Sequence, residues 1–381
     1  MRGDDHGGDE VDGEAGEEND SGDARAPDSY NEHIRNNNLL PELEGLRAVA
    51  SLGILVTHVA FQTATDSPVL ARFDYFVAVF FALSAFLLAR GTPRPGYCRR
   101  RLARIAPAYV VCVVVVSLVL PELSLLDAPR FLANLFLLQI YVPDGLVAGL
   151  TQMWSLCVEV AFYLLLPLYL RLSLSRRRLF LVLAVPLSLL WPWLVDSVSW
   201  VNMQIWPPSY VPWFAVGLAA AEAERAGLAW RWPRWPVALL FLPLAWLGGV
   251  LGPEGLEHPT PAEFNVRVLI GACFAAVLVV PFALGPRASG VLASRVMTHL
   301  GRWSYSIFLW HVAVLSFAFP VLGVPVFSGR FVPVLLFTAA ASVAVAYVSY
   351  ECVEVPGARW VSRGLERFGR LSGYFGVRTE G

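Results

Sequence analysis

The chain is divided into long apolar runs, and this pattern limits its fold more than any other feature of the sequence. Ten runs are long enough, or nearly so, to cross a bilayer as helices of about 20 residues. They lie near 44–64, 70–89, 105–120, 153–170, 179–195, 209–221, 236–251, 266–285, 303–320 and 331–350. Only 15% of the residues are charged, against about 25% in soluble domains. The sequence therefore predicts an all-α, polytopic integral membrane protein with about ten transmembrane helices.

Two stretches need separate interpretation. The sixth run, 209–221, is short and contains Pro212, which favours a kinked or tilted helix. Residues 131–142 are apolar but too few to span a bilayer comfortably. We predict a re-entrant or interfacial helix there, because counting it as a span would reverse the orientation of every later segment.

Arginine placement predicts the orientation, because cytoplasmic loops carry an excess of basic residues. With the amino terminus inside, five segments face inward and hold between three and six Arg each. These are 90–104, 171–178, 222–235, 286–302 and the carboxyl-terminal tail. The outer loops hold only Arg72, Arg130, Arg267 and Arg330, together with acidic residues. We therefore expect both termini in the cytoplasm.

The two ends of the chain differ from the apolar part between them. Residues 1–38 are rich in Asp, Glu, Gly, Asn and Ser and hold almost no large apolar residues, so we expect a disordered acidic tail. Residues 357–381 combine arginines with Trp360, Leu365 and Phe368. We expect this basic amphipathic tail to lie on the inner leaflet, attracted to anionic lipid.

Arg47 and His58 form the first candidate pair for chemistry. Arg47 stands where the first apolar run begins, and His58 follows eleven residues later. A helix would place His58 roughly 16 Å deeper than Arg47, about half the thickness of the hydrocarbon core. An ionisable group at that depth indicates function. The alternative is an ordinary inner-face arginine and a hydrogen-bonded core histidine.

A second candidate is the arginine cluster before the third apolar run. Arg101 and Arg104 are three residues apart, so on a helix they share a face. Guanidinium groups bind phosphate oxygens in a bidentate manner, and such a cluster at the mouth of a span is suited to a polyanion. The alternative is that these arginines only set the topology.

Two further stretches bring polar groups into spans. Glu159 begins the fourth run four residues after Ser155, where it can pair with an arginine, orient a histidine or bind a sugar hydroxyl. A stabilising ion pair between helices is the alternative. Tyr305 and His311 lie within the ninth run, again at membrane depth.

The end of the last run, 350–356, carries two carboxylates, and we interpret it as structural, with Pro356 closing the helix. The five cysteines are scattered. The sequence contains no glycine-rich phosphate loop, paired metal ligands or GxSxG elbow. We predict neither a metal site nor a nucleic-acid partner.

Taken together, these stretches resemble membrane-bound acyltransferase family 3, integral enzymes that O-acylate surface glycans, peptidoglycan and some macrolides. The resemblance covers roughly residues 41–356. Its motifs occur in the family's order. They are Arg-x10-His at Arg47 and His58, FFxLSGFL at 80–87, Arg-x-x-Arg at Arg101 and Arg104, WSLxVExxFY at 154–163, SYxxYLxH at 304–311 and ExP at 354–356.

This chain departs from the family pattern at a few positions. Glu44 replaces the usual Asp before Gly-Leu-Arg, and Ala85 replaces a Gly in the second span. Ala78 stands where many members have Asp, so any role of that carboxylate is absent here. Phe308 stands in place of the second Tyr of SYxxYLxH. None of these changes touches the arginines or His58.

The resemblance implies a multi-pass bacterial plasma-membrane enzyme that uses acyl-CoA, in particular acetyl-CoA, as a donor substrate and holds no bound cofactor. Residues 39–356 would form the transmembrane acyltransferase domain. As a hypothesis, Arg101 and Arg104 bind the CoA phosphates, and the pantetheine arm runs past Arg47 toward His58. A neutral His58 then acts as general base on an acceptor hydroxyl while Arg47 steadies the oxyanion or positions the donor. Direct transfer and an acyl-His intermediate both fit the sequence.

Four residues would line the part of the site that binds the acceptor or would orient His58. They are Ser155, Glu159, Tyr305 and His311. The acceptor would be a carbohydrate, peptidoglycan or a macrolide-type molecule. One rival function is a proton-coupled transporter or channel that uses the intramembrane histidines and forms no covalent product. Another is a lipid-linked sugar transferase, but no acidic DxD-like pair faces the cytoplasm to hold the metal it would need.

Overall fold

A computed structural model gives the fold of the chain. It describes residues 40–91, 96–124, 126–252, 258–286, 290–361 and 363–364. The chain divides into two units, Met1–Leu40 and Pro41–Gly381, and the description below concerns the second. The predicted acidic tail and most of the predicted basic tail lie outside the described residues. Every regular element of the described part is a helix, as predicted.

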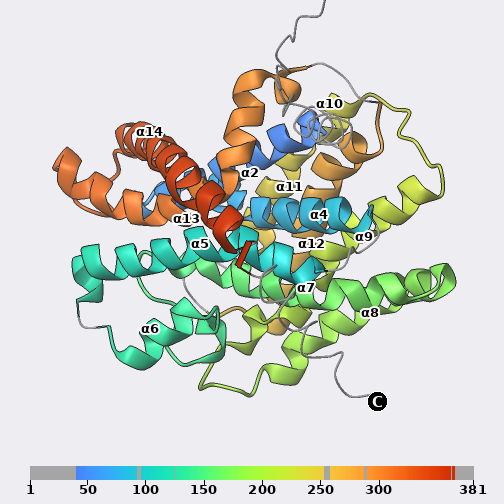
Figure 1. Cartoon of the computed structure of the whole chain (residues 1–381), viewed down its shortest axis with the longest axis horizontal. Coiled ribbons are helices and arrows are strands. Elements are labelled where there is room, and N and C mark those ends of the chain that lie inside the picture. The colour runs from blue at the N-terminus through green and yellow to red at the C-terminus, as the bar shows by residue number, and fades with distance from the viewer. Residues whose placement is uncertain are drawn as a thin grey trace, which may run out of the picture. The chain divides into compact units, whose positions relative to one another are not determined.

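The helices follow one another in chain order and are shown in Figure 1. The longer ones are α2 (Pro41–Gln62), α4 (Phe76–Ala89), α5 (Tyr97–Val119), α7 (Trp154–Arg171), α8 (Leu174–Val195), α9 (Val211–Arg225), α11 (Phe241–Leu251), α12 (Pro261–Ala283), α13 (Arg295–Leu322) and α14 (Phe331–Ser349). The shorter ones are α3 (Pro68–Ala71), α6 (Ala128–Leu135) and α10 (Arg234–Ala238). Single turns include η1 (Phe73–Tyr75), η2 (Pro121–Leu123), η3 (Gln139–Tyr141), η4 (Thr151–Met153), η5 (Met203–Ile205), η6 (Pro207–Tyr210) and η7 (Val291–Ala293).

Nine helical stretches of the described residues are long and apolar enough to cross a membrane, one fewer than the ten predicted. The difference lies at 209–221, where the structure has α9. This helix has 15 residues, because Pro207 and Pro208 stand in the 3₁₀ turn before it and Pro212 occupies its first turn, where a missing amide hydrogen is tolerated. α9 packs closely on α4, since a side chain at Gly217 would overlap the carbonyl of Ala82.

The apolar stretch 131–142 does not form a spanning helix. α6 has eight residues and ends at Leu135. Asp127 caps its first turn by accepting a hydrogen bond from the Arg130 amide, and the Asn134 side-chain amide donates to the carbonyl of Gly145. The structure therefore agrees with the predicted short, non-spanning helix.

The prediction that Pro356 closes the last helix is wrong. The backbone forms a π-helical turn at η8 (Tyr350–Glu354), and helix then continues to Val361. A proline is tolerated in the first turn after such a bulge, because the carbonyl it would otherwise bond is already displaced.

α2 lies between α13 and α4 at the centre of the unit (Figure 1). It approaches α13 closely, because a side chain at Gly301 would overlap the carbonyl of Glu44. Small residues commonly permit such contact between membrane helices. Beyond this contact, α2 and α13 share an apolar cluster with α14 that includes Leu55, Leu315 and Val334. This packing fixes α2 against α13 along most of its length.

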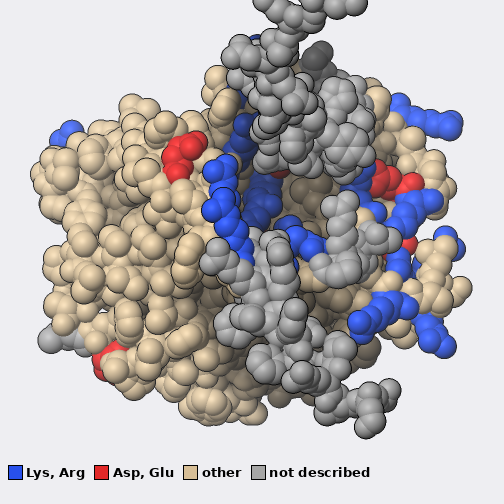
Figure 2. Space-filling view, in the orientation of Figure 1, with Lys and Arg blue, Asp and Glu red and all other residues tan. Residues whose placement is uncertain are grey.

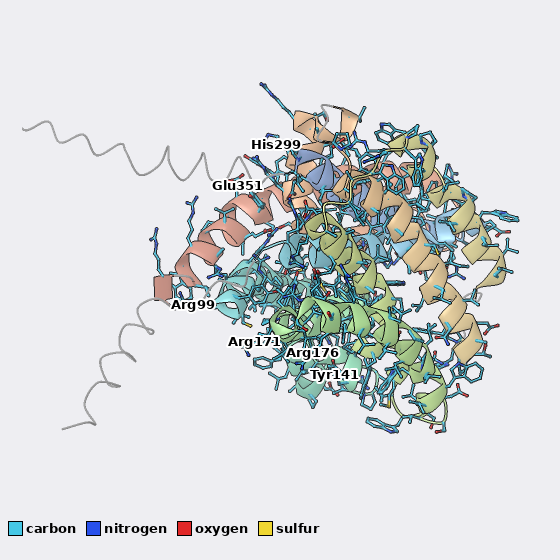
Figure 3. All side chains as sticks on the ribbon, turned by 90° about the vertical axis from the view of Figure 1, so that its right-hand side faces the viewer. Arg99, Tyr141, Arg171, Arg176, His299 and Glu351 are labelled. Carbon is cyan, nitrogen blue, oxygen red and sulfur yellow. The ribbon has the colours of Figure 1, made fainter. Side chains whose placement is uncertain are left out.

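The predicted inner segments lie toward one side of the unit. Arg99, Arg171, His299 and Glu351 lie toward the left of Figure 3, where α5 and α13 begin and α7 and α14 end. The grouping agrees with the prediction that successive connecting segments lie alternately at two opposite faces. Which side of a membrane this face occupies stays a prediction.

Candidate active site

A pocket opens among α2, α4, α5, α7 and α13 and encloses about 830 Å³, including its open mouth. Apolar side chains of α4 form one wall. The charged and polar residues of the lining are Arg47, Ser84, Arg101, Arg104, Ser155, Glu159, Tyr163 and Tyr305. Six of the eight predicted site residues therefore line one pocket, although they come from four helices.

Arg101 and Arg104 stand in the first turns of α5, and both face this pocket. Within the described residues, neither forms an ion pair with a carboxylate, and the buried Nε of Arg101 has no hydrogen-bond partner. Other arginines of the predicted inner segments form ion pairs; Arg90, for example, lies 2.6 Å from Glu224. Figure 2 shows basic side chains gathered around a hollow near the centre of this face. The pocket lining thus holds three arginines, Arg47, Arg101 and Arg104, against one carboxylate, that of Glu159.

Arg47 reaches the same pocket from α2. Its Nε donates to the Ser304 hydroxyl at 3.3 Å and lies 4.0 Å from a Glu44 carboxylate oxygen. The close packing of α2 on α13 creates this contact. Arg47 is therefore held against α13.

Glu159 is fixed by two hydroxyl donors. Ser84 and Tyr163 both donate to the same carboxylate oxygen, each at 2.5 Å. Tyr163 lies four residues after Glu159, so both share one face of α7. The carboxylate is thereby oriented into the pocket across from the arginines. Roles for Ser84 and Tyr163 were not predicted, although both lie in the motifs quoted above.

His58 and His311 form a pair on neighbouring helices. Their ring centroids are 5.1 Å apart and their planes are tilted by 52°. Neither residue lines the pocket. Phe308 lies beside both the pocket and His311, because its ring lines the pocket and its centroid lies 5.9 Å from that of His311.

The expected open path from Arg47 to His58 is therefore absent from this structure. Phe308 also packs edge-on against Phe80, with centroids 6.3 Å apart, and Phe80 lines the pocket too. Phe80 and Phe308 thus form an aromatic layer in the pocket wall, and Phe308 is the member that lies next to His311. Eleven residues are close to three helical turns, so Arg47 and His58 still share one face of α2.

A family profile described as an acyltransferase domain matches residues 40–351. The chain belongs to this acyltransferase family. The acyltransferase MdmB of Streptomyces mycarofaciens is 29% identical over 326 residues, which are 74% of this chain and 81% of that protein. No solved structure matches the chain significantly.

Two other relatives of this acyltransferase are longer proteins. The peptidoglycan O-acetyltransferase OatA of Listeria monocytogenes is 23% identical over 363 residues, covering 83% of this chain and 55% of that protein. The O-acetyltransferase OatA of Staphylococcus aureus is 24% identical over 359 residues, covering 83% of this chain and 57% of that protein. This chain thus spans little more than half of the OatA proteins. Acyl transfer is the activity that the family and these relatives share, and the two OatA proteins are named as O-acetyltransferases.

Two hydroxyls of the acyltransferase pocket already have protein partners. The Tyr305 hydroxyl donates to the backbone carbonyl of Ile105 at 3.0 Å, which ties α13 to α5. The Ser155 hydroxyl donates to the carbonyl of Gln152 at 3.2 Å. Both residues line the pocket, but each hydroxyl already donates its hydrogen to a backbone carbonyl of the chain.

Glu354 is a site neighbour that sequence reasoning interpreted as structural. It is 5% exposed and accepts a hydrogen bond from the Ser306 hydroxyl at 2.9 Å. Arg104 and Arg47 are the cations within electrostatic range of it. Glu354 therefore stands behind the pocket arginines rather than in the lining.

Among the described residues, no three His, Cys, Asp or Glu side chains are grouped as metal ligands.

Proposed function

We propose that this membrane acyltransferase moves an acyl group, in the simplest case acetyl, from cytoplasmic acyl-CoA to a hydroxyl of a carbohydrate or glycosylated acceptor. The observation that carries the proposal is the pair of arginines without a carboxylate ion pair, Arg101 and Arg104, in a pocket whose lining residue Phe308 lies next to His311. Phosphate groups suit such guanidinium pairs. The protein would be multi-pass in a bacterial plasma membrane.

The CoA phosphates would bind Arg101 and Arg104, and the pantetheine arm would extend into the pocket toward Arg47. Arg47 would face the thioester carbonyl, where a guanidinium stabilises the negative charge that develops on oxygen. A shift of the Phe308 ring would then admit the thioester to His58. This aromatic layer would also keep water from the thioester until an acceptor is present.

His58 would act as general base in the transfer step. It would take the proton from the acceptor hydroxyl while that oxygen attacks the thioester carbonyl. The C–S bond would break, and the proton would pass from His58 to the thiolate, giving CoA and the ester. Transfer through an acyl-His intermediate uses the same residues.

The acceptor class is supported by the relatives, two of which are named as O-acetyltransferases and one of these as a peptidoglycan O-acetyltransferase. Glu159, held by two hydroxyls at the pocket wall, supplies an acceptor oxygen of the kind that binds sugar hydroxyls. Peptidoglycan, other surface carbohydrate and macrolide-type acceptors all fit this chemistry.

The experiment uses membranes from a deletion strain of the source organism that expresses the full chain. Transfer of ¹⁴C from [¹⁴C]acetyl-CoA to endogenous acceptors is measured, together with CoA release. We expect both activities to require the protein and His58, so His58→Ala should abolish them. His299→Ala is the matched control, because His299 is exposed and outside the site. Near-wild-type turnover in His58→Ala would refute the base assignment.

A proton-coupled transporter or channel is the second candidate, and the adjacency of His58 and His311 favours it. Two neighbouring imidazoles can pass a proton between them. The same radiolabel decides between the two functions. Label that stays on CoA or appears only as free acetate, with no acylated acceptor, would favour transport.

A further inference from the structure

The local contacts of His311 determine which of its ring nitrogens carries hydrogen. Its Nδ1 lies 2.8 Å from the backbone carbonyl of Phe308 and 3.2 Å from that of Ile307. A carbonyl oxygen only accepts hydrogen bonds, so Nδ1 must donate. In the neutral ring, Nε2 is then the unprotonated nitrogen and presents a lone pair.

That lone pair has no partner in the described part of the chain. His311 is 0% exposed, and its Nε2 is buried without a hydrogen bond. A buried acceptor left unpaired is costly, and such groups in native proteins commonly mark a function or a bound molecule. The ring next to it is that of His58, whose centroid lies 5.1 Å away.

We propose that His311 is a positioning residue that accepts a hydrogen bond from His58 through Nε2. This inference rests on the proposed function of His58 as the base. The bond would fix the tautomer of His58, because the nitrogen facing His311 must carry hydrogen. The other nitrogen of His58 is then bare and available to the acceptor hydroxyl.

The same bond stabilises the charged state formed during transfer. When His58 takes the acceptor proton, it becomes an imidazolium with hydrogen on both nitrogens. One N–H points to His311 Nε2, and the other later returns its proton to the departing thiolate. The proton count balances without any transfer to His311, which stays neutral throughout.

A neutral acceptor suits this depth in the membrane. A carboxylate next to His58 would add a second buried charge, which is expensive in low-dielectric surroundings. Asp74 of η1 is within electrostatic range of His58, but it is already paired with Arg267 of α12. His311 can therefore orient His58 while adding no charge of its own.

The test compares His311→Gln with His311→Met in the full-length protein. The two side chains have nearly the same shape, but only Gln offers an acceptor oxygen close to the position of Nε2. Transfer from [¹⁴C]acetyl-CoA to endogenous membrane acceptors gives kcat and the KM for acetyl-CoA, normalised to the amount of protein. His299→Ala again serves as the control.

We expect His311→Met to lower kcat by about 100-fold, the scale of a positioned acid–base group, while His311→Gln stays within about tenfold of wild type. The KM for acetyl-CoA should change by less than about twofold in both, because the arginine pocket is intact. Equal losses in both variants would mean that an acceptor at this position is not what the reaction requires, and would overturn the inference.

Near-wild-type kcat in His311→Met would also overturn it, while leaving the proposed function standing if His58→Ala is inactive. Activity in His58→Ala would instead refute the base assignment on which the inference rests. A larger loss in both His311 variants than in His58→Ala would mean that His311 is itself the base, contrary to the role assigned here.

Discussion

Among single residues, Arg101 and Arg104 have the clearest expected phenotype, because no described carboxylate neutralises either of them. Replacing either one by Gln removes a charge-assisted hydrogen bond to phosphate, which contributes about 1.5–3 kcal/mol. We expect the KM for acetyl-CoA to rise between about tenfold and 100-fold. Steady-state kinetics in membranes measures this change.

A truncated donor provides the control for these variants. Acetyl-pantetheine lacks the phosphates of CoA, so its KM should be the same in wild type and in Arg101→Gln or Arg104→Gln. Arg176→Gln, on the exposed start of α8, should leave both donors unaffected. An equal rise in KM for the two donors would show that these arginines do not bind phosphate.

Removing the charge of Glu354 should change the KM for acetyl-CoA in the opposite direction from removing an arginine charge. Its carboxylate lies behind Arg104 and Arg47 without a close ion pair to either, so it lowers the positive potential of the pocket. Glu354→Gln keeps the shape and the bond from Ser306 but removes the charge. We expect the KM for acetyl-CoA to fall by about twofold to tenfold, consistent with a partly screened charge. A raised KM would contradict this electrostatic role.

At the scale of helices, the close approach of α2 and α13 sets the position of Arg47. A side chain at Gly301 would overlap the Glu44 backbone, and backbone cannot move aside as a flexible side chain can. We expect Gly301→Ala to destabilise the protein by about 1–3 kcal/mol and to reduce transfer. Thermal unfolding in detergent measures this. Gly290→Ala should leave stability unchanged, because a Cβ atom added there would meet no atom within 4 Å beyond its chain neighbours.

The helices and most of the pocket residues could be predicted because their signals are local. Apolar runs report spans directly, and charged groups such as Arg101 and Glu159 stand out within or beside them. Ser84 and Tyr163 gave no comparable signal, since hydroxyls are common in membrane helices. Their role depends on Glu159 lying between them, which only the packing of α4 on α7 reveals.

Other features depend on contacts between residues distant in sequence. The Phe308 barrier arises from its packing against Phe80 of another helix. Glu354 was visible as a carboxylate, but its partner Ser306 is 48 residues away. The rule that proline ends a helix failed at Pro356, because a π-helical turn precedes it.

For the whole molecule, the decisive question is whether α9 counts as a crossing, because it is shorter than the nine other candidates. Its carboxyl end meets the carboxyl end of α4, since Arg225 donates to the Ala89 carbonyl and Arg90 pairs with Glu224. Its amino end follows a segment in which Trp206 donates to the carbonyl of Ile140, a residue of a predicted outer loop.

One end of α9 thus contacts the end of α4 that leads into a predicted inner segment, and the other follows a contact with a predicted outer loop, so we expect ten crossings with both termini inside. Reporter fusions in a bacterial host test this. Alkaline phosphatase fused after Ser173 or after Gly364 should be inactive, whereas a fusion within the 252–260 loop should be active. If α9 does not cross, the orientation of every later segment inverts, because an odd number of spans separates the ends. An active phosphatase after Gly364, with the Ser173 fusion still inactive, would therefore place the arginines of 222–235 and 286–302 outside, against the basic excess expected of cytoplasmic loops.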